Sequence, residues 1–251
     1  MNKAQYDAYV AFAKEKLGIE FHDINLLITA LTHRSYVNEH KDSTEHNERL
    51  EFLGDAVLEL VSSDFLFHKY NQPEGIMTAW RAALVNTEAN AAAGERLGYQ
   101  SLVRLSRGEK NGSERAMHVI LADCYEAIIG AIYLDQGYAT AEKFIQENSL
   151  VRIDEIIESE SWRDAKSFLQ VLSQHIDNVT PVYRVIKEEG PDHDKTFTLG
   201  VFINDHLKAT GVGHSKQEAQ VKAASEAIRQ YKREHPKEVE EFKVIWYNNR
   251  D

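Results

Sequence analysis

The residues of this chain that could do chemistry gather first in one acidic stretch, HNERLEFLGDAVLEL, at residues 46–60. Read as a helix, the stretch places four carboxylates in one stripe: Glu48, Glu51, Asp55 and Glu59. Because like charges one turn apart destabilise a helix, such a stripe indicates that a cation lies against it. The alternative is an ordinary solvated acidic face, and this stretch alone does not exclude it.

A second pair of acids lies in the most apolar stretch, VILADCYEAIIGAIYL, at residues 119–134. A helix of this composition is apolar on nearly all sides, which predicts that it is buried. Asp123 and Glu126 share one face of it, and a buried ionised carboxylate must be paired with a cation or hold a metal. A salt bridge to Arg or Lys is one solution. Two acids set against the first stripe favour a hard cation held by oxygens, Mg²⁺ or Mn²⁺.

Helices are the elements that must position these acids. Apolar periodicity and end signals predict one long helix from Asn47 to about Tyr70 and another from Glu114 to about Asp135, with shorter helices around them. The polar stretches at residues 36–45 and 105–113 are predicted to be loops. We therefore expect an all-α domain over residues 1–158.

The pattern changes after residue 158, and residues 159–163 (SESWR) are the predicted linker. A helix is predicted from Asp164, followed by three short strands with period-two alternation and a hairpin turn at Asn204-Asp205. A helix over Lys216–Lys232 completes a small α+β domain of order α-β-β-β-α, at residues 164–235. The tail at residues 236–251 is of unknown role. Three states of the tail are open from the sequence: a disordered segment, a strand docked on the body of the protein, and a motif that binds a partner. We expect docking or disorder.

Charge and cysteine content narrow the class of protein. The formal net charge is −11, and residues 161–251 carry 14 Lys and Arg against 14 Asp and Glu, so the first 160 residues hold the entire imbalance. This argues against coating nucleic acid by bulk positive charge. The single cysteine, Cys124, excludes an internal disulfide and fits a reducing cytosol. Without an apolar signal peptide or a long enough apolar span, we expect a soluble cytoplasmic protein that does not enter the membrane.

The first domain resembles the nuclease domain of the ribonuclease III family. The matching stretches, in the family's order, are LTHRSY (31–36), HNERLEFLGDAVLEL (46–60), PEGIMTAWRAALVN (73–86), LSRGE (105–109) and ILADCYEAIIGAIYLD (120–135). The resemblance implies that four carboxylates bind the metal: Glu51, Asp55, Asp123 and Glu126. It assigns catalysis to Asp55 and Glu126 and a supporting role to Glu48.

The same resemblance implies the reaction. A family member cleaves double-stranded RNA, using carboxylate-bound Mg²⁺ (or Mn²⁺ in its place) to activate water and neutralise phosphate charge. The products carry 5′-phosphate and 3′-hydroxyl ends, with a short 3′ overhang after both strands are cut. The resemblance also implies a homodimer through the catalytic domain, and processing of structured RNA such as ribosomal precursors and messenger RNA. Ser35 beside His33 is given a structural role, because no acid partner completes a triad.

The second domain resembles a double-stranded RNA-binding domain in its DAKSFLQ (164–170), GPDHDKTF (190–197) and GHSKQEAQVKAASEA (213–227) stretches. Such domains read A-form shape through 2′-hydroxyls and phosphates. The resemblance assigns RNA contacts to Ser167, Gln170, His193, Lys195 and Lys216. Ordinary surface polarity is the alternative for the last three residues.

Two alternatives to a nuclease stay open from the sequence. A non-cleaving double-stranded RNA-binding protein on the same two domains is the first, although the four carboxylates weigh against it. Another helical metalloenzyme is the second. A ferritin-like site needs Glu-x-x-His repeats that do not occur here, and His22-Asp23 lacks the partners of a His-Asp phosphohydrolase.

One departure from the family pattern yields a prediction. A second basic residue usually follows the position of Lys216, and this chain has Gln217 there. Each phosphate contact contributes about one unit to the log–log salt slope. The variant Gln217→Lys should therefore bind duplex RNA more tightly, with a salt slope steeper by roughly one unit, as measured by binding titrations at several salt concentrations. A slope no steeper than that of the wild type would contradict this expectation.

Overall fold

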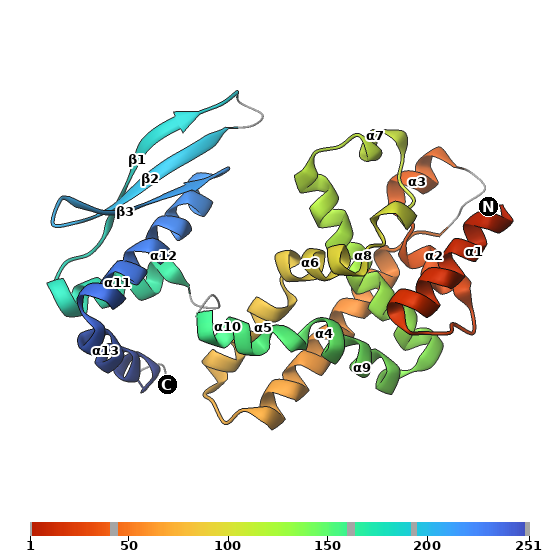
Figure 1. Cartoon of the computed structure of the whole chain (residues 1–251), viewed down its shortest axis with the longest axis horizontal. Helices are drawn as coiled ribbons and strands as arrows, with labels where there is room; N and C mark the ends of the chain where they lie inside the picture. Colours follow the sequence, from red (N-terminus) through yellow and green to blue (C-terminus); the bar gives the residue numbers. More distant parts are fainter. Residues whose placement is uncertain (1, 41–44, 160–163, 192–194, 249–251) are drawn as a thin grey trace. The chain divides into compact units, whose positions relative to one another are not determined.

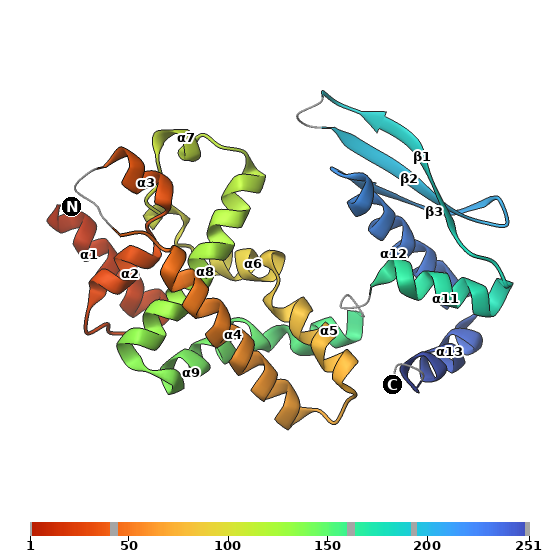
Figure 2. The ribbon, with the colours of Figure 1, turned by 180° about the vertical axis from the view of Figure 1, so that it is seen from behind.

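The computed structural model describes residues 2–40, 45–159, 164–191 and 195–248, without the side chains of residues 159 and 243–248. The chain divides into two compact units, Met1–Trp162 (unit 1) and Arg163–Asp251 (unit 2). Unit 1 is helical, and unit 2 combines helices with a sheet (Figures 1 and 2). The predicted fold class is thereby confirmed. The predicted linker lies almost wholly outside the described residues.

Unit 1 is built from helices of very different length. Its described elements are α1 (Lys3–Phe12), η1 (Ala13–Leu17), α2 (Ile24–Ala30), α3 (Arg34–Glu39), α4 (Glu48–Lys69), α5 (Glu74–Val85), α6 (Thr87–Leu97), η2 (Gln100–Leu102), α7 (Arg107–Lys110), α8 (Glu114–Gln136), α9 (Tyr138–Asn148), η3 (Leu150–Arg152) and α10 (Ile153–Ser159). The two loop predictions are partly wrong, because α3 runs into the first stretch as far as Glu39 and α7 lies within the second. His33 and Ser106 cap these helices, a local stabilisation that hydrophobic periodicity does not register.

Helix α8 is the central element of unit 1. It packs against α2, α4, α6 and α9, and most residues of its second half, from Ile120 to Ile132, are buried. By length and composition alone α8 is sufficient to cross a membrane, which corrects the expectation that it is too short. However, 61% of its most apolar window is buried within the unit, as in the core helix of a globular domain.

Unit 2 contains a three-stranded antiparallel sheet in the order β1-β2-β3, formed by Val182–Glu189, Thr196–Ile203 and His206–Gly213. Asn204 and Asp205, at φ 49° and 61°, form the two-residue turn between β2 and β3. Two consecutive positive φ values are what a type I′ hairpin turn requires. Helices α11 (Ala165–Asp177) and α12 (Lys216–Glu234) complete the predicted order, and α12 packs on β2 and β3.

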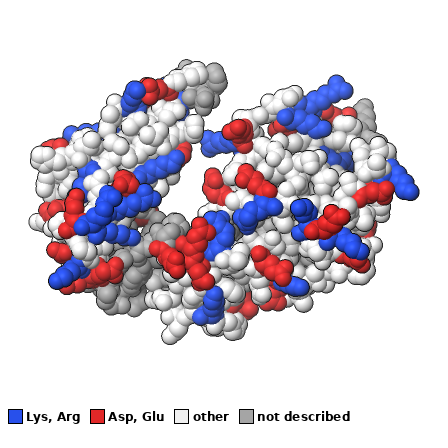
Figure 3. Space-filling view, viewed as in Figure 1, with Lys and Arg blue, Asp and Glu red and all other residues white. Residues whose placement is uncertain are grey.

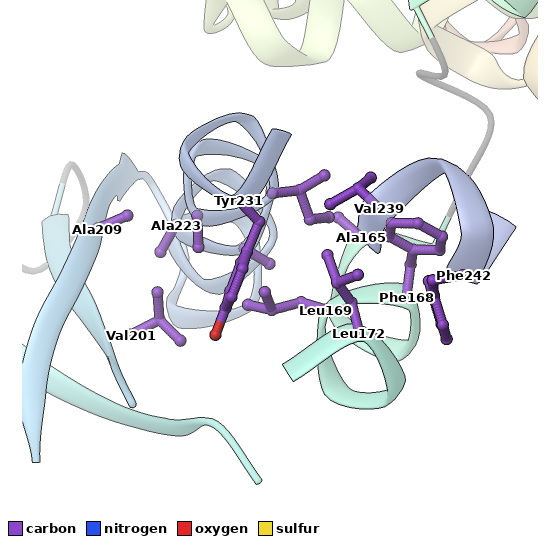
Figure 4. Packing of buried hydrophobic residues seen from close by; sticks show 13 residues of the cluster. Ala165, Phe168, Leu169, Leu172, Val201, Ala209, Ala223, Tyr231, Val239 and Phe242 are labelled. Atoms are coloured by element: carbon purple, nitrogen blue, oxygen red, sulfur yellow. The ribbon is translucent and has the colours of Figure 1, made fainter. Parts of the chain in front are cut away.

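The tail forms a further helix, α13 (Pro236–Asn248), so the strand alternative is wrong. Val239 and Phe242 are buried in the core of unit 2, and the Phe242 ring lies 5.4 Å from that of Phe168 on α11 (Figure 4). A spacing of three residues suits one face of a helix, whereas a strand would place these two side chains on opposite faces. The docked tail therefore extends the small domain beyond residue 235.

Candidate active site

The site is organised by a close crossing of α4 and α8 at two glycines. A methyl group added to Gly54 would lie 1.8 Å from the backbone oxygen of Glu126, and one added to Gly130 would lie 2.2 Å from that of Leu50. No other residue fits at either position without moving a helix, so the two backbones touch here. Asp55, next to Gly54, and Glu51, one turn earlier, are thereby brought beside Asp123 and Glu126.

The start of α4 is held against α8 by a buried asparagine. The backbone N–H of Asn47 donates to the carbonyl of Thr32 at 2.9 Å, and its side-chain amide lies 3.6 Å from the sulfur of Cys124 on α8. Glu48 and Glu51 occupy the first turn, where the helix dipole favours negative charge. The chain thus places the acids at the helix end that tolerates them best.

Among the four carboxyl groups, those of Glu51 and Glu126 have the most strongly raised pKa values. Burial raises the pKa of Glu51 to about 7, with further contributions from the charges of Asp123, Glu48 and Asp55. Burial also raises the pKa of Glu126 to about 7, reinforced first by Asp55, while the hydrogen bond from Asn90 opposes the rise. Carboxylates of both α4 and α8 therefore contribute to the electrostatic field at Glu51 and at Glu126.

The remaining two predicted ligands are shifted in the same direction. Burial raises the pKa of Asp123, and the nearby His33 offsets part of this effect. Asp55 is more exposed; burial is still the main cause of its raised pKa, followed by the charge of Glu59. All four carboxyl groups are thus harder to ionise than a free side chain, as expected where like charges meet with little solvent.

Glu48 and Glu59 lie at the edges of this cluster. The Glu48 carboxylate is 3.5 Å from the Arg34 guanidinium and 3.8 Å from His46, and about half of its side chain is exposed. Glu59 lies 3.8 Å from Arg81. Each has a cation of its own, so the acidic stripe divides into a shared centre and two ends that are paired elsewhere.

The donor set suits a hard cation. Four carboxylates provide oxygen ligands, and beside them the buried Oδ1 of Asn90 has no hydrogen-bond partner among the described residues. Such a set matches Mg²⁺ or Mn²⁺ and not a thiolate-bound ion. Within the described part of the chain, no three His, Cys, Asp or Glu side chains already stand as a metal centre.

Sequence reasoning missed Asn90. This α6 residue is 1% exposed, and its side-chain amide donates to Oε1 of Glu126 at 2.8 Å. No sequence signal indicates the contact, because 36 residues separate the partners and a helical asparagine has no motif of its own.

Ser35 and His33 lie at the other side of Asp123 but do not form a nucleophile pair. Nδ1 of His33 is 2.8 Å from the Ser35 hydroxyl, which accepts the backbone N–H of Ser106. His33 also caps α3, so both side chains join segments of the fold. Next to them, an open pocket of about 410 Å³ is lined by residues that include His33, Glu109, Arg115 and Asp123.

In unit 2, Lys195 and Lys216 converge on one carboxylate. Nζ of Lys216 lies 3.1 Å from Glu188, and that of Lys195 lies 4.0 Å from the same side chain. Glu188 pairs across the sheet with Phe197, whose ring centroid is 5.5 Å from the Lys216 ammonium. Figure 3 shows Lys and Arg interleaved with Asp and Glu on the visible face of unit 2. The two predicted phosphate contacts are therefore adjacent and partly neutralised.

The other predicted RNA contacts lie elsewhere or outside the described residues. Ser167 donates to Asp164 at 2.5 Å at the start of α11, and Gln170 is exposed on the same helix. His193 falls outside the described residues. Lys222 donates to Glu218 at 2.6 Å, so it is already paired and does not replace the cation missing at Gln217.

Family models match most of both units. Residues 23–153 match the model described as ribonuclease-III-like, and residues 165–231 match the double-stranded RNA binding motif. Each match falls within one of the two predicted domains, and α13 lies beyond the second match.

Similar proteins extend over nearly the whole chain. Ribonuclease 3 of Enterococcus faecalis is 44% identical over 86% of this chain and 94% of its own length. Ribonuclease 3 of Clostridium acetobutylicum is 42% identical with the same coverage. A solved nuclease domain of ribonuclease III from Campylobacter jejuni, described with flexibility in a region involved in dimer formation, is 41% identical. Its TM-score is 0.50, and the match covers 55% of this chain and 97% of that domain.

The raised pKa values of Glu51 and Glu126 imply a pH-dependent stability. The native state holds protons that the unfolded chain releases, so the free energy of unfolding should fall as pH rises from 4.5 to about 7. In the presence of a chelator, Glu51→Gln should therefore melt a few degrees above the wild type at pH values above 7, and the gap should close toward pH 4.5.

Thermal melts across this pH range measure the gap directly. Glu155→Gln, which removes an exposed carboxylate of α10 that pairs with Arg152, controls for the loss of one charge. A difference between Glu51→Gln and the wild type that stays constant with pH would refute the raised pKa of Glu51.

Proposed function

Because the chain belongs to the ribonuclease III family, and is therefore an endoribonuclease with a double-stranded RNA-binding domain, we propose that it hydrolyses duplex RNA at the α4–α8 crossing with the help of Mg²⁺. Mn²⁺ is the expected substitute. The proposed ligands are Glu51, Asp55, Asp123 and Glu126, with Glu48 in support. The single observation that carries the proposal is the meeting of four acidic side chains, all with raised pKa values, at a crossing of two helices.

The chain's own residues contribute placement and charge. When bound, the cation supplies a more acidic water and neutralises charge on the phosphate oxygens. Asp55 and Glu126 are the proposed catalytic pair, one more exposed and one half-buried, facing the reacting phosphate from different helices. Oε1 of Glu126 is engaged by Asn90, so Oε2 is the oxygen available toward the substrate and the cation. Anionic RNA can approach these acids only while their charge is compensated.

Unit 2 would hold the duplex through Ser167, Gln170, His193, Lys195 and Lys216. The proposed products carry 5′-phosphate and 3′-hydroxyl ends, and structured RNA such as ribosomal precursors and messenger RNA are the proposed substrates. The buried free thiol of Cys124 agrees with a reducing compartment, and we place the activity in the cytoplasm.

We also propose a homodimer through unit 1. On α4, Phe52 is 81% exposed and Phe67 is 70% exposed. A groove of about 430 Å³ between α4 and α5 is lined by residues that include Leu60, Phe67 and Met77. Large exposed apolar side chains rimmed by polar residues, such as Ser63 and Thr78 in this groove, mark association surfaces. The related Campylobacter jejuni domain, with its region involved in dimer formation, supports the same assignment.

Cleavage of an end-labelled RNA duplex, with and without Mg²⁺, tests the proposed reaction. We expect Mg²⁺-dependent cutting with 5′-phosphate and 3′-hydroxyl ends, and a loss of about 10²- to 10³-fold in Glu126→Gln, since a charge at the reacting centre is removed. Glu155→Gln, at a carboxylate that is 68% exposed on α10, is the matched control and should cut like the wild type. No cleavage by the wild type in the presence of Mg²⁺ would leave the chain a non-cleaving RNA-binding protein. Equal, metal-independent cleavage by the wild type and Glu126→Gln would overturn the proposed metal site, and 3′-phosphate ends would exclude the mechanism.

The proposed dimer yields a second test. Phe52→Asp places a charge in the apolar surface of α4, so the variant should sediment as a monomer at concentrations where the wild type is a dimer. Val151→Asp, at an apolar residue that is 66% exposed on η3, is the matched control and should leave the dimer intact. A Phe52→Asp variant that stays dimeric would place the interface elsewhere.

A further inference from the structure

The side chain of Asn90 is an amide buried between two helices of unit 1. It is 1% exposed on α6, where α6 packs along α8 (Figure 1). Its Nδ2 donates to two acceptors, Oε1 of Glu126 at 2.8 Å and the backbone carbonyl of Val85 at 3.2 Å. These two bonds set the orientation of the amide, because a flipped side chain would turn its oxygen toward two other oxygens.

The remaining polar atom of this side chain argues against a purely structural role. Oδ1 of Asn90 is buried and has no hydrogen-bond partner among the described residues. A buried acceptor without a donor costs free energy that an apolar residue of the same shape would avoid. Asn90 donates one hydrogen bond to the last carbonyl of α5 and the other to a carboxylate of the proposed metal site.

We propose that Asn90 is a positioning residue for the nuclease reaction, which holds one oxygen of Glu126 so that the other faces the cation and the substrate. This inference rests on the proposed function of Glu126. A carboxylate side chain has three rotatable bonds, and fixing one oxygen restricts the carboxylate to a narrow set of orientations before a cation binds. Asn90 acts through Glu126 and makes no contact with the reacting phosphate.

The test compares two asparagines at the same helix junction. Asn90→Leu keeps a branched side chain and removes the hydrogen bond to Glu126. The matched control is Asn86→Ala, which removes the cap of α6, where Oδ1 of Asn86 accepts the backbone N–H of Ala89 at 2.8 Å. Both variants weaken the junction of α5 and α6, and only Asn90→Leu touches the carboxylate. Asn90→Ala replaces Asn90→Leu if the larger side chain prevents folding.

The first readout is independent of activity. Each full-length variant is melted at increasing Mg²⁺ concentration, and the concentration that gives half of the rise in Tm is compared with that of the wild type. We expect this midpoint to move about 10- to 100-fold higher in Asn90→Leu and to stay in place in Asn86→Ala, since residues that orient metal ligands typically contribute this much to metal affinity.

The second readout is the cleavage rate of duplex RNA at saturating Mg²⁺. Asn90→Leu should lower kcat and leave KM for the RNA unchanged, because only the orientation of a carboxylate is lost. Adding Asn90→Leu to Glu126→Gln should have no further effect, since the two residues act as one unit.

The outcomes separate this inference from the proposed function. If Asn90→Leu matches Asn86→Ala in Mg²⁺ midpoint and kcat, Asn90 only supports the fold and the inference is overturned. If Glu126→Gln itself leaves the Mg²⁺ response and the cleavage unchanged, the proposed metal site fails. Loss of both responses in Glu126→Gln together with the predicted shift in Asn90→Leu supports both.

Discussion

The contact of two helix backbones at Gly54 and Gly130 is the constraint on which the rest of unit 1 depends. Helices with ordinary side chains at the contact lie 8–10 Å apart, and glycine permits a closer approach. Here a single added methyl group at either position would overlap a backbone oxygen of the facing helix. This close approach brings acids from α4 and α8 near enough to raise one another's pKa values, so the glycines shape the electrostatics of the site although they carry no charge.

This arrangement stores unfavourable electrostatic energy at the centre of the domain. Four carboxyl groups with raised pKa values meet between a core helix and a surface helix, while Glu48 and Glu59 find cations of their own. The fold tolerates the cost because α8 is buried among four other helices and contributes a large apolar area. An ion bound by the four acids would offset the same cost, which couples the proposed cofactor to stability as well as to catalysis.

Unit 2 differs from unit 1 in the balance of its charged residues. Its positive and negative residues balance, and Glu188 draws Lys195 and Lys216 to one place beside Phe197. An exposed ion pair of this kind contributes only about 0–1 kcal/mol, so an RNA phosphate can compete for both ammonium groups. The apolar side of the unit is completed by α13, whose Val239 and Phe242 bury part of α11 that the shorter α-β-β-β-α order would leave open.

Local periodicity in the sequence was enough to predict the helical first domain and the α-β-β-β-α second domain, and the resemblance of its motifs to those of a known family predicted the family. The Asn204-Asp205 turn was predictable for the same reason, since its backbone geometry depends on neighbouring residues only. The carboxylates were predicted by type and by motif, and their assignment as metal ligands stays a prediction. What only the tertiary structure decided is contact between distant segments: the glycine crossing, the bond of Asn90 to Glu126, the sharing of Glu188 by two lysines and the docking of α13. Such contacts depend on how helices and strands pack in three dimensions. The spacing of residue types along a single sequence does not reveal them.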